Sequence, residues 1–143
     1  MRKDARAYSL TFWAIFIGFV MMPIMAMTIE LGRYFYARAQ ISAAADAAAL
    51  GAAIEINQRT FRTTGNLVPT DQTWSQAQSM VNANTGMLSS QGIHAWVTGI
   101  NVNDAANTVQ VSVSCNLSRL FPAVVPNVIV AQTGLAEVGA FTL

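Results

Sequence analysis

Two adjoining stretches decide the fold: Leu10–Ile29, LTFWAIFIGFVMMPIMAMTI, and Glu30–Ile56, ELGRYFYARAQISAAADAAALGAAIEI. The first stretch is twenty residues long and carries no charge. A helix needs about 20 apolar residues to cross the hydrocarbon core of a bilayer, and a single span can pair its backbone amides only as a helix. No stop signal separates the two stretches, so we predict one long helix, half in lipid and half outside, with a kink at Pro23.

The basic start of the chain allows a second interpretation, a cleaved signal peptide. A signal peptide has an apolar region of about 7–15 residues that ends in a small-x-small site. The run here is longer, and Ile24–Ala26 matches such a site poorly. We therefore expect a retained span. By the positive-inside rule, Met1–Ser9 stays in the cytoplasm and the C-terminal part lies outside.

Composition limits the classes of function. Of the 143 residues, 53% are hydrophobic and 10% charged, where about 25% charged is usual. The net charge of +1 does not suggest nucleic-acid binding. One cysteine excludes an intrachain disulfide framework. The signature motifs of soluble enzymes are absent, and neither a nucleophile–base pair nor a metal set is visible. We expect no catalytic activity and no cofactor.

The chain divides into four parts, and the predicted fold class is α+β. Residues 1–9 form a cytoplasmic segment, residues 10–29 the transmembrane helix, and residues 30–58 its extracytoplasmic continuation. Residues 59–143 form a small domain with a short helix and an antiparallel sheet. This places the protein in a membrane as a single-pass protein.

Turn residues and apolar spacing predict the first elements of that domain. Asn57–Pro69 contains glycine and proline and is typical of a loop. A helix begins at Thr70 or Asp71 and ends at Gly86. Its buried face is expected to carry Trp74, Ala77 and Val81, at spacings of three and four residues.

Beyond Gly92 the apolar period changes to two, which indicates strands. Residues 93–102 and 108–116 form a hairpin around the turn at 103–107, and residues 128–141 form a third strand. Cys115 lies on the apolar face of the second strand, where a buried free thiol is expected. His94, in the first strand, is the single histidine; one histidine alone does not make a metal site.

The alanine-rich half of the long helix has two possible partners. Ten of the seventeen residues from Ala37 to Ala53 are alanine, and small side chains let another backbone approach closely. Ile41, Ala44 and Ala48 share one face. That face could pack on the chain's own sheet, which needs a cover, or on identical helices of other subunits.

Two further features lie near the predicted membrane surface. Glu30 and Arg33, spaced i, i+3, could pair along the helix or between subunits; we favour an exposed, solvated pair of small energetic value. The apolar loop 117–127 could be a partner-contact site or part of the core. Its candidate contact residues are Leu120, Phe121, Val124 and Val125.

Residues 27–53, MTIELGRYFYARAQISAAADAAALGAA, carry a resemblance to a known family. This stretch resembles the N-terminal part of the TadE/TadG-like proteins of the tight-adherence (Flp) pilus system. Those proteins have an acidic residue after a membrane helix, then Gly-Arg, an aromatic residue, Gln and an Ala-Asp-Ala block. The matching residues are Glu30, Gly32, Arg33, Tyr36, Gln40, Asp46 and Leu50.

The resemblance implies a minor pilin, pseudopilin or assembly factor. Such a protein has a pilin-like fold and works in a bacterial inner membrane with other pilin-like subunits and, indirectly, with a secretion ATPase and its inner-membrane platform. Our first hypothesis is a structural component that assembles through its N-terminal helix; the alternative is a membrane-anchored extracytoplasmic binding or assembly module that does not polymerise. The expected helix interface consists of Glu30, Gly32, Arg33, Ile41, Ala44 and Ala48.

Prepilin peptidase substrates have a glutamate before the apolar run, but here only Asp4 stands there, so we expect the residues before Leu10 to be kept.

Overall fold

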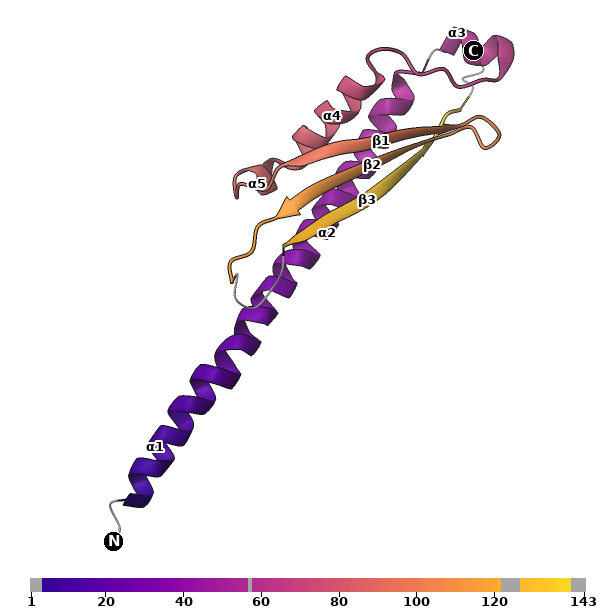
Figure 1. The fold of residues 1–143 in the computed structure, drawn as a ribbon. Coiled ribbons are helices and arrows are strands. Elements are labelled where there is room, and N and C mark those ends of the chain that lie inside the picture. The colour runs from indigo at the N-terminus through magenta and orange to yellow at the C-terminus, as the bar shows by residue number, and fades with distance from the viewer. Residues whose placement is uncertain (1–3, 57, 122–126, 140–143) are drawn as a thin grey trace.

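A helical column and a three-stranded sheet make up the computed structural model, which describes residues 4–56, 58–121 and 127–139. The column consists of α1 (Asp4–Phe16), the π-helical turn η1 (Ile17–Met21) and α2 (Met22–Ile54). Three short helices follow: α3 (Gln58–Thr64), α4 (Thr73–Asn84) and α5 (Gly86–Ser89). The strands are β1 (Ala95–Asn103), β2 (Thr108–Leu117) and β3 (Val128–Glu137). The fold is α+β and pilin-like, as predicted (Figure 1).

The column continues past Pro23 without a break (Figure 1). Proline lacks an N–H, and its ring crowds the carbonyl four residues earlier. The turn just before it is widened: the Met22 N–H donates to the Ile17 carbonyl, five residues back. Such π-helical turns accommodate a local irregularity inside a helix. We predicted a kink at Pro23, and the structure has this widened turn before it; the predicted long helix is confirmed as far as Ile54.

The sheet is an antiparallel meander in the order β1-β2-β3. In the central strand, Val113 pairs with Val97 on one side and with Gln132 on the other. The inward-facing residues of β2 are completely buried, as the alternating pattern predicted: Val109, Val111, Val113 and Cys115. The predicted hairpin and its turn are confirmed, although β1 begins at Ala95 and β3 ends at Glu137. Residues 140–141 of the predicted third strand lie outside the described residues.

The alanine-rich half of α2 covers the inner face of the sheet, and α4 packs beside it (Figure 1). Seven α2 residues on this side are completely buried: Ala37, Ile41, Ala44, Ala45, Ala48, Ala49 and Ala52. Alanine has little side-chain bulk, so the strands and α4 approach the helix backbone closely. Of the two partners considered for this face, the chain's own domain is the one observed.

Two glycines mark the closest approaches to α2. A Cβ atom on Gly134 of β3 would overlap the backbone carbonyl of Ala45. A Cβ on Gly51 would lie 2.7 Å from Cγ of Met80 in α4. The first neighbour is backbone and cannot swing aside, whereas the second is a flexible side chain. Gly134 is therefore a packing requirement of the third strand.

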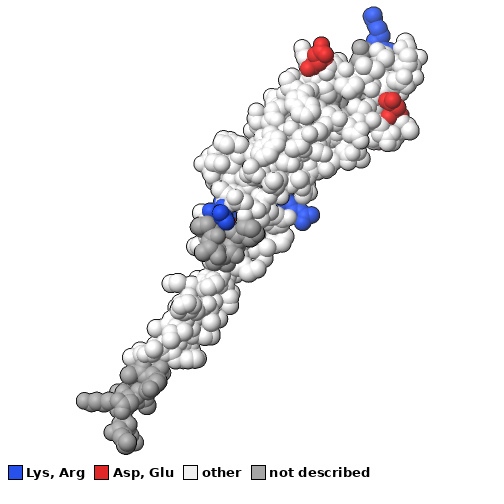
Figure 2. Space-filling model, in the orientation of Figure 1, with Lys and Arg blue, Asp and Glu red and all other residues white. Residues whose placement is uncertain are grey.

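By contrast, residues 9–29 of the column, which we call the bare segment, have almost no cover from the rest of the chain. Phe19 is 80% exposed and Leu10 is 74% exposed. Figure 2 shows no charged side chain on the visible face of this segment. The column is thus a stalk over one half and the central core element of a domain over the other.

Three sequence predictions in the domain are wrong. The predicted loop 57–69 contains α3, whose Phe61 is buried in the core, a tertiary contact that local turn signals do not report. Helix α4 ends at Asn84, and Gly86 begins α5. Trp74 is 49% exposed, because α4 buries the i, i+4, i+8 stripe Thr73, Ala77 and Val81. That stripe is small enough to lie close to α2, and the indole stays outside.

The Gly134 contact predicts a stability change. Gly134→Ala should lower the free energy of unfolding of the full chain in detergent by about 1–3 kcal/mol, because the methyl group would overpack against the helix backbone. Gly99→Ala in β1 is the matched control, since nothing lies within 4 Å of a Cβ there. Denaturant unfolding monitored by circular dichroism measures both variants. Equal stabilities for the two would contradict the packing requirement.

Candidate functional site

Glu30 is buried at the point where the bare segment meets the domain. It is 5% exposed, although it directly follows the uncharged run of the sequence. Its Oε1 accepts hydrogen bonds from the backbone N–H groups of Leu120 and Phe121, the latter at 3.0 Å. One carboxylate oxygen therefore holds the chain segment that follows β2.

Arg33 completes this connection from the next turn of α2. Its guanidinium lies 3.0 Å from Oε2 of Glu30 and donates to the carbonyl of Ser118, also at 3.0 Å. We call Ser118–Phe121 the anchored loop, because Glu30 binds its N–H groups and Arg33 binds a carbonyl. Burying a carboxylate is costly unless it is paired and hydrogen-bonded, and here it has both kinds of partner.

The pairing along the helix that we considered for Glu30 and Arg33 is observed, but the favoured description of an exposed, solvated pair is wrong for Glu30. The loop that buries the carboxylate lies about 90 positions further along the chain, between the end of β2 and the start of β3. The i, i+3 spacing places both side chains on one side of the helix. It contains no information about which distant backbone they meet.

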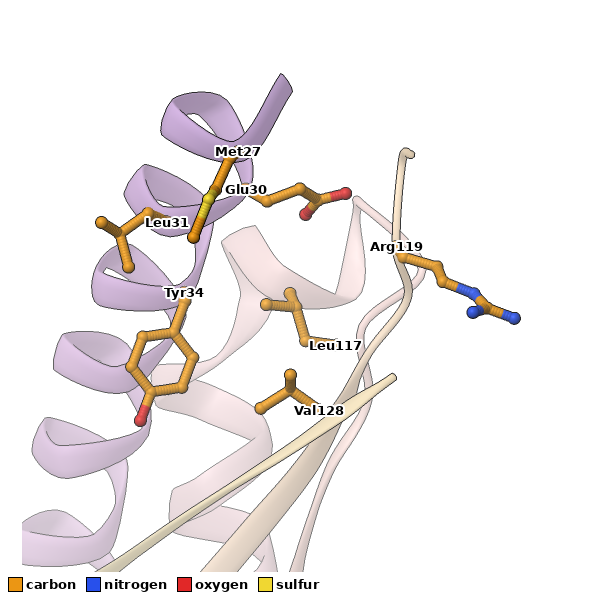
Figure 3. Close-up of a pocket in the computed structure, with 7 residues that line it drawn as sticks. All are labelled: Met27, Glu30, Leu31, Tyr34, Leu117, Arg119 and Val128. Atoms are coloured by element: carbon orange, nitrogen blue, oxygen red, sulfur yellow. The ribbon is translucent and has the colours of Figure 1, made fainter. Parts of the chain in front are cut away.

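Two apolar hollows flank the anchored loop. The first, about 290 Å³, lies between α2 and the ends of β2 and β3 (Figure 3). It is lined by Met27, Glu30, Leu31, Tyr34, Leu117, Arg119 and Val128. In Figure 3 the Arg119 guanidinium points away from the helix, so the space is bounded chiefly by apolar side chains and the Tyr34 ring.

The second hollow, about 490 Å³, lies along the bare segment. Its lining is entirely apolar: Gly18, Met22, Pro23, Met25, Ala26, Ile29 and Phe121. Six of these seven residues belong to the predicted span, and Phe121 comes from the anchored loop. The loop therefore reaches the level of the uncharged run.

The residues expected to form a helix interface fall into three groups. Glu30 and Arg33 bind the anchored loop of their own chain. Ile41, Ala44 and Ala48 are completely buried within their own domain, so they could contact a second subunit only if the sheet moved away. Gly32 is exposed, with nothing within 4 Å of a Cβ; of this set it is the one open to a neighbouring helix.

Only part of the candidate contact loop lies within the described residues. Leu120 is 57% exposed and Phe121 is 36% exposed, which favours a contact site over a core position for these two residues. Val124 and Val125 lie outside the described residues. Their predicted contact role stays a prediction.

The sequence interpretation missed a second face of α2. Opposite the sheet, exposed residues recur at spacings of three, four and seven: Gly32, Tyr36, Ala39, Ala43, Leu50 and Ile54. We call this set the outer stripe. Leu50 is 60% exposed and Ile54 is 69% exposed. Helical periodicity could have revealed this stripe, but it could not tell which of two small-residue faces the sheet would cover.

The remaining chemistry-bearing residues within the described ranges do not gather into a site. His94 is exposed just before β1. Cys115 is completely buried, and its burial raises the pKa of the thiol, partly opposed by the Val130 backbone N–H. Among the residues that the structure describes, no group of three or more His, Cys, Asp or Glu side chains could hold a metal ion.

The family comparison matches the column. Residues 9–55 match the model of a family described as putative Flp pilus-assembly TadE/G-like. The long helix of this chain is TadE/G-like. The matched range includes the bare segment, Glu30, Arg33 and the alanine-rich half, so the resemblance inferred from residues 27–53 is confirmed there. Neither the curated proteins nor the solved structures gave a match.

The TadE/G-like helix also meets the physical requirement for a membrane anchor. The helix from Ser9 to Ile54 includes an 18-residue window with a mean hydropathy of 2.1, enough in length and composition to cross a bilayer. A role in Flp pilus assembly and anchoring in a membrane both agree with this segment.

The hydrogen bonds of Glu30 predict a local change in stability. Glu30→Ala removes the acceptor from the Leu120 and Phe121 N–H groups. Bonds to a charged group contribute about 1.5–3 kcal/mol, so amide exchange at these two positions should accelerate roughly 30-fold, the equivalent of about 2 kcal/mol. Glu30→Gln keeps an acceptor oxygen and should have a smaller effect. NMR exchange rates in micelles decide this, and unchanged rates in Glu30→Ala would refute the anchoring role.

Proposed function

We propose that this protein is a structural, pilin-like subunit, a minor pilin or a pseudopilin, of a tight-adherence (Flp-type) pilus or a related secretion system. It is held in the inner membrane by a single span with its N-terminus in the cytoplasm, and it assembles through its long helix. The observation that supports this most strongly is the division of that helix. One half is the core of a folded domain, and the other half has its apolar surface open.

The bare segment requires a partner that is not water. Its large apolar side chains include Phe12 at 63% exposure, Phe19 at 80% and Met22 at 64%. Lipid can cover such a surface before assembly, and the helices of other subunits can cover it afterwards. The family match over residues 9–55 includes the whole of this segment, which supports pilus assembly as the purpose of the uncovered surface.

The outer stripe extends the available surface beyond the membrane. Gly32, Ala39 and Ala43 are small and exposed, and small residues allow two helices to approach closely. Their chain's own sheet lies on the opposite face. We propose this stripe, in place of Ile41, Ala44 and Ala48, as the helix–helix contact with neighbouring pilin-like subunits. The secretion platform and its ATPase would act on the subunit indirectly.

One observation favours the alternative, an anchored module that does not polymerise. The outer face of the sheet exposes three large apolar side chains: Trp96 at 38%, Ile129 at 67% and Leu135 at 62%. An exposed apolar face is typical of a surface that binds another protein. In that case the helix would be only an anchor, and the outer stripe would have no role.

Substitution in the outer stripe separates the two functions. Ala43→Leu adds bulk at an exposed position, so the monomer should remain folded, whereas a tightly packed helix contact would lose about 1–3 kcal/mol. We expect roughly tenfold less of this variant in sheared surface filaments. Ala83→Leu, at an exposed alanine of α4, is the matched control and should be incorporated like the parent.

Quantitative immunoblotting of purified filaments, with immunogold electron microscopy, gives the result. If Ala43→Leu and Ala83→Leu are incorporated equally, the outer stripe is not the contact. If the parent is absent from filaments, the polymer hypothesis fails and the anchored module remains.

The proposed orientation has its own test. Asn66 is exposed in the domain, so the cysteine in Asn66→Cys should react with a membrane-impermeant maleimide on intact spheroplasts. The native Cys115 is completely buried and should contribute little background, because a thiol with a raised pKa is also less nucleophilic at neutral pH. The parent chain is the control. Labelling of Asn66→Cys only after the membrane is broken would reverse the orientation.

A further inference from the structure

We propose that the anchored loop is a second membrane contact, with Leu120 and Phe121 inserted into the outer leaflet beside the helix. This inference rests on the proposed membrane anchoring of residues 10–29. The ligand is the phospholipid of that leaflet: acyl chains against the two apolar side chains, and anionic headgroups against nearby arginines.

The depth of Phe121 is the first argument. Phe121 lines the larger hollow together with Met22, Met25 and Ile29, all within the uncharged run. The Phe121 N–H is bound to Glu30. An α-helix rises 1.5 Å per residue, so Ile29 and Met25 lie roughly 2 and 8 Å along the axis from Glu30. The backbone of Phe121 therefore stays near the edge of the uncharged run, and its ring extends from there toward the hydrocarbon. In a bilayer, the material that surrounds an apolar hollow at this depth is acyl chain.

The state of the loop backbone is the second argument. Lipid-exposed irregular backbone does not occur within the hydrocarbon region, so this loop can insert side chains only if its backbone stays at the membrane surface, at the level of Glu30. The N–H groups of Leu120 and Phe121 are bound to Glu30, and the carbonyl of Ser118 is bound to Arg33. Meanwhile the Leu120 side chain is 57% exposed. Three backbone groups of the loop are thus paired within the protein while the Leu120 side chain stays exposed, an arrangement that lowers the cost of inserting this side chain.

The distribution of charge agrees with a lipid surface at this level. Figure 2 shows basic side chains where the domain meets the bare segment and also at the far end of the domain, whereas the acidic side chains visible on this face lie only toward the far end. Arg119 is part of the anchored loop, and its guanidinium points away from the helix (Figure 3). Basic side chains beside a membrane interface are attracted to anionic headgroups.

Two attachment points would restrict the domain more than one helix does. A single helix permits tilt and rotation, which interfacial anchors normally limit. With Leu120 and Phe121 inserted, the side of the column that carries the loop is turned toward the bilayer. The sheet, whose strands β2 and β3 lie on either side of the loop in the sequence, then has one orientation relative to the bilayer.

The experiment measures lipid contact directly in the full chain. Leu120→Cys is labelled with an environment-sensitive fluorophore and placed, one copy per disc, in phosphatidylcholine–phosphatidylglycerol nanodiscs with brominated or ordinary acyl chains. The native Cys115 is buried and remains unlabelled. Phe19→Cys in the span and Leu135→Cys on the sheet, which are 80% and 62% exposed in the parent, are the lipid and water references.

Brominated lipid should quench the label at position 120, as at position 19, because bromine lies within the roughly 30 Å hydrocarbon core. The label at position 135 should instead be quenched by aqueous iodide. If position 19 is quenched and position 120 behaves like position 135, the loop is not inserted, although residues 10–29 still anchor the chain in the membrane. If position 19 is not quenched, the anchoring itself fails. If position 120 is shielded from iodide only in discs with several copies, contact between subunits replaces the lipid contact.

Discussion

The close packing of the sheet on an alanine face of α2 is the constraint on which the rest of this structure depends. Ala45 and Ala48 leave space that larger residues would fill, and Gly134 lets β3 approach the helix backbone itself. A core built this way derives its stability from many close contacts rather than from large side chains. It also determines which face of the helix remains open, because a helix covered on one side by its own domain can offer only the other to neighbours.

The face of α2 that the sheet covers determines which surfaces of the protein remain exposed. The sheet lies along only the second half of the column, which leaves residues 9–29 bare and the outer stripe exposed. Glu30 lies at the boundary between the two halves. There its carboxylate is both a structural acceptor for the anchored loop and the first charge after the apolar run. A single residue thus connects the core of the domain with the part of the chain that lies nearest the proposed membrane.

The features that local patterns predicted well share a physical origin. The long helix follows from an uncharged run joined to an alanine-rich run, each of which favours helix for its own local reason. The β2 strand follows from strict alternation, which completely buries Val109, Val111 and Val113. The TadE/G-like character was visible in residues 27–53, because an ordered set of residue types along one helix is a local feature. Trp74 was misplaced because Thr73 and Trp74 precede Ala77 by four and three residues, and both spacings fit one helix face.

By itself, then, the sequence determined the elements, their order and the family likeness of the helix, since these depend on residues that are neighbours along the chain. Only the tertiary structure decided which small-residue face of α2 the sheet covers, and which backbone the Glu30 carboxylate binds. Both depend on contacts between positions far apart in sequence: Ala45 with Gly134, and Glu30 with Leu120 and Phe121. The residue pattern of one helix carries no information about such distant partners. The free energy that selects which face of the helix is buried comes from the packing of the whole domain.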